Sequence, residues 1–130
     1  MDQEIIIAGR KIGRKHPPYL IAELSANHNR DIERAYRIME AAKEAGADAI
    51  KLQTYTADTI TMNSKDENFM IRGGLWDGRS LYELYQSASL PWEWHPLLFE
   101  KAASLAEIDY HKLDDKGKTS LKVIGDHSRA

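Results

Sequence analysis

The chain has 130 residues, of which 42% are hydrophobic and 29% are charged, and its formal net charge is -2 at pH 7. This length and composition fit one soluble globular domain and exclude a disordered chain. The small net charge and the scattered Lys and Arg residues argue against a nucleic acid or an anionic membrane as partner. The chain has no cysteine, which excludes disulfides, thiolate metal sites and cysteine nucleophiles.

The N-terminal residues predict neither a signal peptide nor a membrane anchor. Residues 1–4 are acidic, and the apolar run of residues 5–8 is too short for either segment. We therefore expect a cytoplasmic protein. Residues 5–12 alternate weakly between apolar and polar and are interrupted by glycine, which predicts a short hairpin before the main domain.

The next residues predict a strand, a helix and a second strand. Residues 19–25 and 47–53 are short apolar runs typical of buried strands. Between them, Asp31 suits the N-cap of a helix with apolar residues at helical spacing, and Gly46 suits its end. A strand, a helix and a strand in succession favour a parallel βαβ unit, so the predicted fold class is α/β.

Residues 54–90 form an unusually long connection with few periodic apolar positions, which is more typical of a functional loop than of a spacer. Within it, residues 80–88 predict a short helix. A second helix is predicted from Pro91, placed in its first turn, to about Ser104, with Trp94, Leu97, Leu98, Lys101 and Ala102 facing a sheet. Beyond Leu105 the composition becomes polar, and residues 121–124 are the last strand-like stretch.

Charged and polar residues stand inside the two predicted core strands. Alternation along a strand places Glu23 on the face opposite Ala22 and Leu24. The same alternation places Lys51 and Gln53 on one face, opposite Ile50 and Leu52. If helices cover the aliphatic side, these three polar residues share the other side, near the carboxyl ends of adjacent parallel strands, where α/β proteins bind ligands.

Two interpretations of this pattern stay open. Glu23 and Lys51 can form a structural ion pair, because neighbouring strands lie about 5 Å apart. Alternatively, Lys51 offers a cation for a phosphate or carboxylate, Glu23 an acid or base, and Gln53 both a donor and an acceptor. The loop of residues 25–30 is dense in hydrogen-bonding groups and favours a functional site, although His28 taken alone is typical of an exposed loop histidine.

Three tryptophans also have alternative roles. Trp76, Trp92 and Trp94 could form a wall on which a sugar stacks. Helix packing is the better explanation of Trp94, and Trp92 could simply fix the entry of its helix.

Four motifs resemble a known family. Residues 21–29 (Ile-Ala-Glu-Leu-Ser-Ala-Asn-His-Asn) and 45–53 (Ala-Gly-Ala-Asp-Ala-Ile-Lys-Leu-Gln) are similar to the opening of the N-acetylneuraminic acid synthase family. Residues 71–79 (Ile-Arg-Gly-Gly-Leu-Trp-Asp-Gly-Arg) and 90–95 (Leu-Pro-Trp-Glu-Trp-His) look most like the pseudaminic acid synthase branch of that family. The resemblance extends from Ile5 to about Leu105.

The resemblance implies the fold and the reaction. Members of this family use a TIM (β/α)8 barrel to condense phosphoenolpyruvate with an acetamido sugar into a nonulosonic acid, with release of phosphate and support from a divalent metal, Mn or Mg. It assigns Glu23 to the catalytic, metal-and-sugar side of the site, and it places Lys51 and Gln53 against phosphoenolpyruvate. Asn27 and His28 belong to the matching motif and are expected to support substrate binding. A homodimer is expected for the full-length parent.

The chain also departs from the family. The third strand of the family carries a Phe-Ser-Thr-Pro-Phe-Asp-like motif, which is absent here. We therefore expect residues 1–105 to be the N-terminal part of such a barrel and residues 106–130 to be a divergent, unrelated tail, produced by a premature stop or a frameshift. A barrel needs about 250 residues, so this chain cannot close one.

Incompleteness of the barrel leads to further expectations. No metal ligand is assigned to this chain, because the ligands are expected in the missing part. We expect the chain itself to be inactive and to aggregate or form an oligomer. A non-catalytic binding fragment is the alternative, and a different small α/β enzyme with the same opening is a weaker one.

Overall fold

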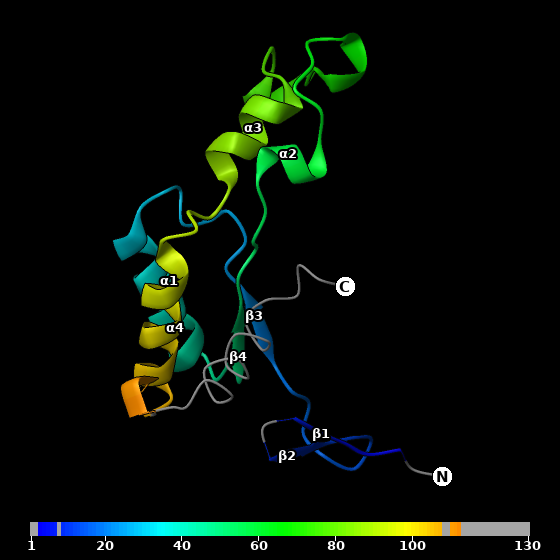
Figure 1. Ribbon diagram of the computed structural model, residues 1–130. Coiled ribbons are helices and arrows are strands. Elements are labelled where there is room, and N and C mark those ends of the chain that lie inside the picture. The colour runs from blue at the N-terminus through cyan, green and yellow to red at the C-terminus, as the bar shows by residue number, and fades with distance from the viewer. Residues whose placement is uncertain (1–2, 8, 108–109, 113–130) are drawn as a thin grey trace.

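A computed structural model describes residues 3–7, 9–107 and 110–112 of the chain. The predicted strand-like stretch 121–124 and most of the predicted tail lie outside these residues. The described part contains a hairpin, a two-stranded parallel sheet covered by two helices, and a helical projection formed by the long connection of residues 54–90 (Figure 1).

The predicted hairpin is confirmed. Strand β1 (Ile5–Ile7) pairs antiparallel with β2 (Arg10–Ile12), and Ile5 stands opposite Ile12. Gly9 lies in the turn with a φ of 78°, a conformation that glycine adopts without steric cost. The hairpin is therefore closed by local turn geometry.

An ion pair ties the hairpin to the parallel sheet. The Arg10 guanidinium bonds to the Asp48 carboxylate, and its second nitrogen donates to the Pro18 carbonyl at 3.0 Å. The other Asp48 oxygen accepts the backbone N–H of Leu20 at 2.8 Å. This N–H and the Arg10 cation lower the pKa of Asp48, so the carboxylate stays charged. Asp48 thus joins the chain segments that enter both core strands.

The predicted βαβ unit is also confirmed. Strand β3 (Ile21–Glu23) and β4 (Ala49–Lys51) are parallel, and α1 (Ile32–Glu44) connects them. Asp31 caps α1 by accepting the backbone N–H groups of Glu33 and Arg34 at 3.0 and 3.3 Å. The regular strands are shorter than the apolar runs that predicted them.

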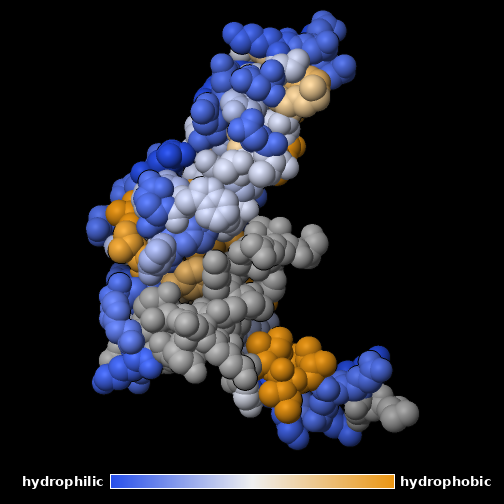
Figure 2. All heavy atoms as spheres, viewed as in Figure 1, coloured by the Kyte–Doolittle hydropathy of each residue, from blue (hydrophilic) through white to orange (hydrophobic). Residues whose placement is uncertain are grey.

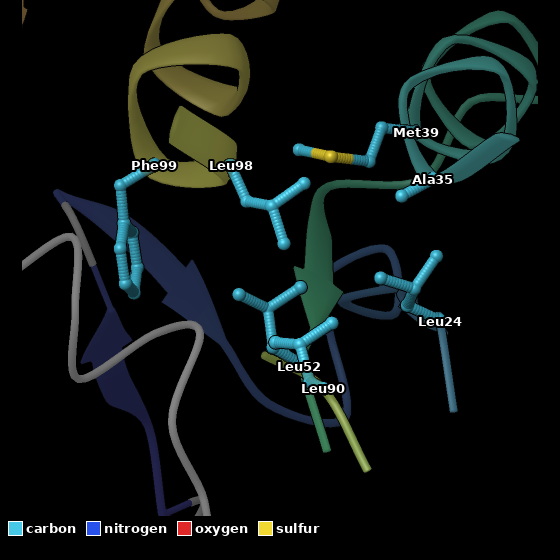
Figure 3. Close-up of a cluster of buried hydrophobic side chains, with 7 residues drawn as sticks. All are labelled: Leu24, Ala35, Met39, Leu52, Leu90, Leu98 and Phe99. Carbon is cyan, nitrogen blue, oxygen red and sulfur yellow. The ribbon is translucent and has the colours of Figure 1, made fainter. Parts of the chain in front are cut away.

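Helices α1 and α4 (Trp94–Leu105) cover one side of the parallel sheet (Figure 1). Leu24 and Leu52 point from the strand ends into the space between the helices (Figure 3). Leu98 and Phe99 come from α4, and further buried side chains complete one contiguous cluster. Its buried members are Leu24, Ala35, Met39, Leu52, Leu90, Leu98 and Phe99.

The long connection forms a helical projection rather than an irregular loop. It contains α2 (Ala57–Ile60) and α3 (Leu81–Ala88), together with two short 3₁₀ turns at Glu67–Phe69 and Gly74–Trp76. Ser80 and Glu83 form a reciprocal capping box at the start of α3, as the predicted helix 80–88 requires. The sequence did not predict α2. Figure 1 shows that the projection stands away from the sheet and its two covering helices.

Two details of the predicted last helix are wrong. The helix begins at Trp94 rather than at Pro91, and residues 91–93 form a turn before it. Pro96 can occupy the first turn of α4 because the N–H groups there need no intrahelical partner. Leu97 was expected to face the sheet but is 44% exposed, since the buried face of the helix is centred on His95, Leu98 and Phe99.

The predicted α/β class is confirmed, but the parallel strands β3 and β4 do not close into a barrel within the described residues. An apolar patch on the hairpin faces solvent (Figure 2), and it includes Ile5 and Ile6. No helix in the described ranges is long and apolar enough to cross a membrane.

We predict that Leu98→Ala lowers the free energy of unfolding by about 2–5 kcal/mol, because it leaves a cavity between α1, α4 and the sheet. Leu97→Ala, on the same helix but partly exposed, should cost far less. Urea unfolding followed by circular dichroism measures both values. Equal losses in the two variants would contradict the burial pattern of α4.

Candidate functional site

Glu23 and Lys51 lie opposite each other at the ends of β3 and β4. They are direct partners in the parallel register. The Lys51 Nζ lies 3.1 Å from Glu23 Oε1. The Glu23 side chain is 59% exposed and that of Lys51 33% exposed, so solvent and solutes reach the pair. The pair is therefore accessible, unlike a buried structural ion pair.

The predicted division of the sheet into an apolar and a polar face is confirmed. Leu24 and Leu52 are in the core, whereas Glu23 and Gln53 are exposed and Lys51 is half-buried. Gln53 follows Lys51 by two residues, which places it on the same side of the extended chain. One polar edge thus carries a carboxylate, an ammonium group and an amide.

This edge can bind an anion and transfer a proton. The ammonium group of Lys51 has three N–H donors, and Glu23 accepts one of them. The others remain for a phosphate or carboxylate, and the negative partner keeps the lysine oriented. Glu23 uses one oxygen on Lys51, so its second oxygen can accept a proton from a bound molecule.

The loop after β3 holds Asn27 and His28 in different ways. Asn27 is exposed, and both its backbone N–H and its side-chain amide donate to the Leu24 carbonyl at 3.2 Å. His28 is fully buried, and its Nδ1 accepts the backbone N–H of Arg30 at 3.0 Å. Burial lowers the pKa of His28, and the charge of Arg30 lowers it further.

These two residues thus differ in access to solvent. Asn27 is exposed and lies in the loop that follows β3, at the end of that strand where Glu23 stands. His28 in this conformation contacts protein groups instead, including the ring of Trp94 at 5.5 Å between centroids. The expectation that His28 is an exposed loop histidine is wrong, because its side chain is buried. Substrate binding by either residue stays a prediction.

Sequence reasoning missed a buried hydrogen bond next to this edge. The Thr54 hydroxyl lies 2.7 Å from His95 Nε2, and Thr54 directly follows Gln53. His95 Nδ1 lies 3.0 Å from the Trp92 carbonyl, and the two rings stack at 5.3 Å. A signal was present in the sequence, because His95 lies within the predicted last helix and Thr54 directly follows the predicted second core strand.

The rings of the three tryptophans contact three different side chains in the structure. Trp94 packs against His28, Trp92 stacks on His95, and the Arg79 guanidinium lies 5.5 Å from the centroid of the Trp76 ring. Trp94 therefore has the packing role that the sequence favoured.

A hollow lies beside α3, away from the sheet edge. It has a volume of about 510 Å³ and is lined by Arg30, Arg79, Glu83, Gln86 and Ser87. Arg30 Nη1 donates to the carbonyls of Gln86 and Ser89, and Arg79 Nη2 donates to that of Glu83. Arg30 therefore caps carbonyls at the end of α3, whereas Arg79 bonds a carbonyl in its first turn, so both cations have protein partners without a ligand.

The edge does not fit a metal ion by itself. Mn²⁺ and Mg²⁺ prefer several oxygen or imidazole ligands around one point. Among the residues that the structure describes, no group of three or more His, Asp or Glu side chains is placed to hold a metal. At the edge, Glu23 is already paired with a cation, so these residues do not form a metal centre.

Comparison with known proteins identifies relatives of most of the chain. A family model described as "NeuB family" matches residues 38–110, which is more than half of the chain. A pseudaminic acid synthase from Campylobacter jejuni is 61% identical over 84 residues, which make up 65% of this chain and 24% of that protein. The chain thus spans about a quarter of the length of this curated relative.

A solved structure supports the same relationship. The crystal structure of an N-acetylneuraminic acid synthetase from Leptospira borgpetersenii aligns with 96% of this chain and 39% of its own chain, at a TM-score of 0.64 and 28% identity. A separate likeness covers a shorter stretch: 33 residues, or 25% of this chain, are 76% identical to 4% of an alanine–tRNA ligase from Synechococcus. With its family match and its structural likeness together, the chain belongs to the NeuB family.

Proposed function

We propose that residues 1–105 are the N-terminal part of a phosphoenolpyruvate-dependent nonulosonic acid synthase of the pseudaminic acid type. The observation that carries this proposal is the 61% identity to a pseudaminic acid synthase, in a chain whose polar sheet edge carries Glu23 and Lys51 in register. The complete enzyme would join phosphoenolpyruvate to an acetamido sugar and release phosphate. The parallel strands β3 and β4 would then be the first two strands of a TIM barrel.

Each residue of the edge has a proposed role. Lys51 binds the phosphate or carboxylate of phosphoenolpyruvate through its remaining N–H donors. Gln53 contacts the same substrate, since it lies on the same side of the strand. Glu23 accepts or donates a proton at the sugar side, and Asn27 supports substrate binding from the loop.

We also propose that the polar tail after residue 105 does not belong to the barrel part formed by residues 1–105. The family match ends at residue 110, close to the point where the composition becomes polar. A non-catalytic fragment that retains the phosphoenolpyruvate side of the barrel is the second candidate, because Lys51 and Gln53 are present without a metal centre in the described residues.

The first test grafts residues 5–105 in place of the matching segment of the Campylobacter jejuni relative. The grafted enzyme should release phosphate from phosphoenolpyruvate when an acetamido sugar and manganese are present. Lys51→Ala should raise the KM for phosphoenolpyruvate at least about tenfold, because a desolvated charge contact is lost. Glu23→Gln should mainly lower kcat, by at least about tenfold, because the amide cannot exchange a proton.

A matched control comes from the hairpin, where Lys11 and Glu4 form an ion pair of 3.4 Å. Lys11→Ala removes a cation of the same kind far from the edge and should leave both kinetic constants unchanged. If Lys51→Ala and Glu23→Gln behave like this control, the edge pair is structural and the assigned roles are wrong. A grafted barrel that binds phosphoenolpyruvate but never releases phosphate would favour the non-catalytic fragment.

A second prediction concerns the 130-residue chain alone. It should release no phosphate with phosphoenolpyruvate, sugar and manganese, because one sheet edge cannot enclose the substrates. It should also elute as an oligomer, since among the described residues both strands of the parallel sheet have a free edge and the hairpin exposes Ile5 and Ile6. Size-exclusion chromatography with light scattering and a phosphate assay test these points. A monomer with measurable turnover would contradict the fragment proposal.

A third prediction tests the proposed boundary. A chain that ends at residue 112 should have the same urea midpoint as the 130-residue chain, because the core cluster of the described residues ends with α4. A chain that ends at residue 93 lacks α4 and should lose its cooperative transition. A lower midpoint for the chain ending at 112 would show that residues 113–130 belong to the folded unit.

A further inference from the structure

We propose that Trp92, Trp94 and His95 form an aromatic clamp that positions both substrate-facing segments of the sheet edge, with His28 and His95 as positioning residues. The substrate-facing roles rest on the function proposed above. The clamp itself rests on contacts that α4 and its preceding turn make with the loop after β3 and with the end of β4. Residues 92–95 thereby contact both the loop after β3 and the end of β4.

His95 makes the contact with the end of β4. The Trp92 carbonyl can only accept, so His95 Nδ1 at 3.0 Å carries a proton. In the neutral ring Nε2 is then an acceptor, and the Thr54 hydroxyl donates a hydrogen bond to it at 2.7 Å. Both ring nitrogens are used, and the ring is 8% exposed. The backbone that carries Lys51 and Gln53 is therefore fixed to α4 directly behind Gln53.

His28 makes the contact with the loop after β3. Its Nδ1 accepts the Arg30 N–H at 3.0 Å, so a neutral ring carries its proton on Nε2. Within the described part of the chain, this buried Nε2 has no hydrogen-bond partner. The ring instead meets Trp94 edge-to-face, at 5.5 Å and 75°. Trp94 thus holds the loop through the histidine.

The loop needs such a restraint because its backbone is unusual. Ser25, Asn29 and Arg30 all have φ values between 49° and 55°, in the left-handed region that residues other than glycine rarely adopt. Residues in this region persist when their surroundings determine them, and such residues cluster at functional sites. His28 lies between Ser25 and Asn29 in the chain and accepts a hydrogen bond from the backbone N–H of Arg30. It therefore fixes the conformation that presents Asn27.

The clamp explains a feature that simple packing does not. Packing alone would accept any ring of similar size at positions 28 and 95. The hydrogen bonds instead require opposite tautomers: a proton on Nε2 in His28 and on Nδ1 in His95. The positions of the loop after β3 and of the end of β4 then depend on hydrogen bonds made by individual ring nitrogens of His28 and His95.

The first experiment measures these tautomers. The 130-residue chain is labelled with ¹⁵N-histidine and studied at pH 8 by magic-angle-spinning NMR, which does not depend on oligomer size. Signals are assigned by His28→Asn and His95→Asn. We expect an unprotonated Nδ1 in His28 and a protonated Nδ1 in His95. The same tautomer in both rings, or averaging between tautomers in both, would overturn the proposal.

The second experiment separates positioning from stability. The His95→Gln amide can replace Nε2 and keep the Thr54 bond, whereas the shorter His95→Asn amide can replace only Nδ1. In the grafted barrel, His95→Gln should keep kcat/KM within about threefold of the parent, and His95→Asn should lose at least about tenfold. Glu93→Gln, an exposed change in the same turn, is the control and should have no effect. Equal losses for Gln and Asn at position 95 would overturn the positioning role.

The two proposals fail in different ways. If the unmodified grafted barrel releases no phosphate, the proposed function fails, and the clamp is then judged by the tautomers alone. If the barrel is active but the histidines share a tautomer, the clamp fails and the proposed function remains.

Discussion

Parallel pairing of β3 with β4 in one register is the constraint on which the rest of the structure depends. Glu23 stands opposite Lys51, so the residues that follow, Leu24 and Leu52, point together toward the helices. A slip by one residue would turn Leu24 or Leu52 toward solvent and Glu23 or Lys51 toward the core. The cost of burying either charge makes this register strongly preferred. The hydrophobic core and the polar edge are thus two consequences of one alignment.

Helix α4 links that core to the polar edge. Its Leu98 and Phe99 complete the cluster that α1 and the strands begin. Its first turn lies at the same end of the sheet as the loop after β3 and the end of β4, which it contacts through Trp94 and His95. A helix held by a packed core moves little, so the groups attached to its first turn are held with similar precision.

The described residues form an open two-stranded parallel sheet rather than a closed barrel. Within the described residues the two parallel strands have two free edges, and helices cover only one face of their sheet (Figure 1). In a closed barrel the polar face would look inward and its groups would be enclosed. The accessible ion pair, the exposed Gln53 and the apolar hairpin are all consistent with surfaces that a larger assembly would cover.

Local sequence determined the order of the main elements and the faces of the strands. The Asp31 cap, Gly46 and the alternation around Glu23 and Lys51 act through neighbouring residues, so they can be recognised without a structure. The family relationship was also visible in the motifs. These short-range signals sufficed for the α/β class and for the polar residues of the candidate edge.

Only the tertiary structure decided which side chains meet across long sequence separations. The Thr54–His95 bond joins residues 41 positions apart, and burial of His28 depends on where Trp94 packs. The start of α4 at Trp94 and the exposure of Leu97 follow from how that helix rotates against α1 and the sheet, which helical periodicity alone does not fix. Sequence by itself therefore determined the elements and their polar faces, whereas packing decided their exact ends and the contacts that position the edge, because those contacts exist only once distant segments are brought together.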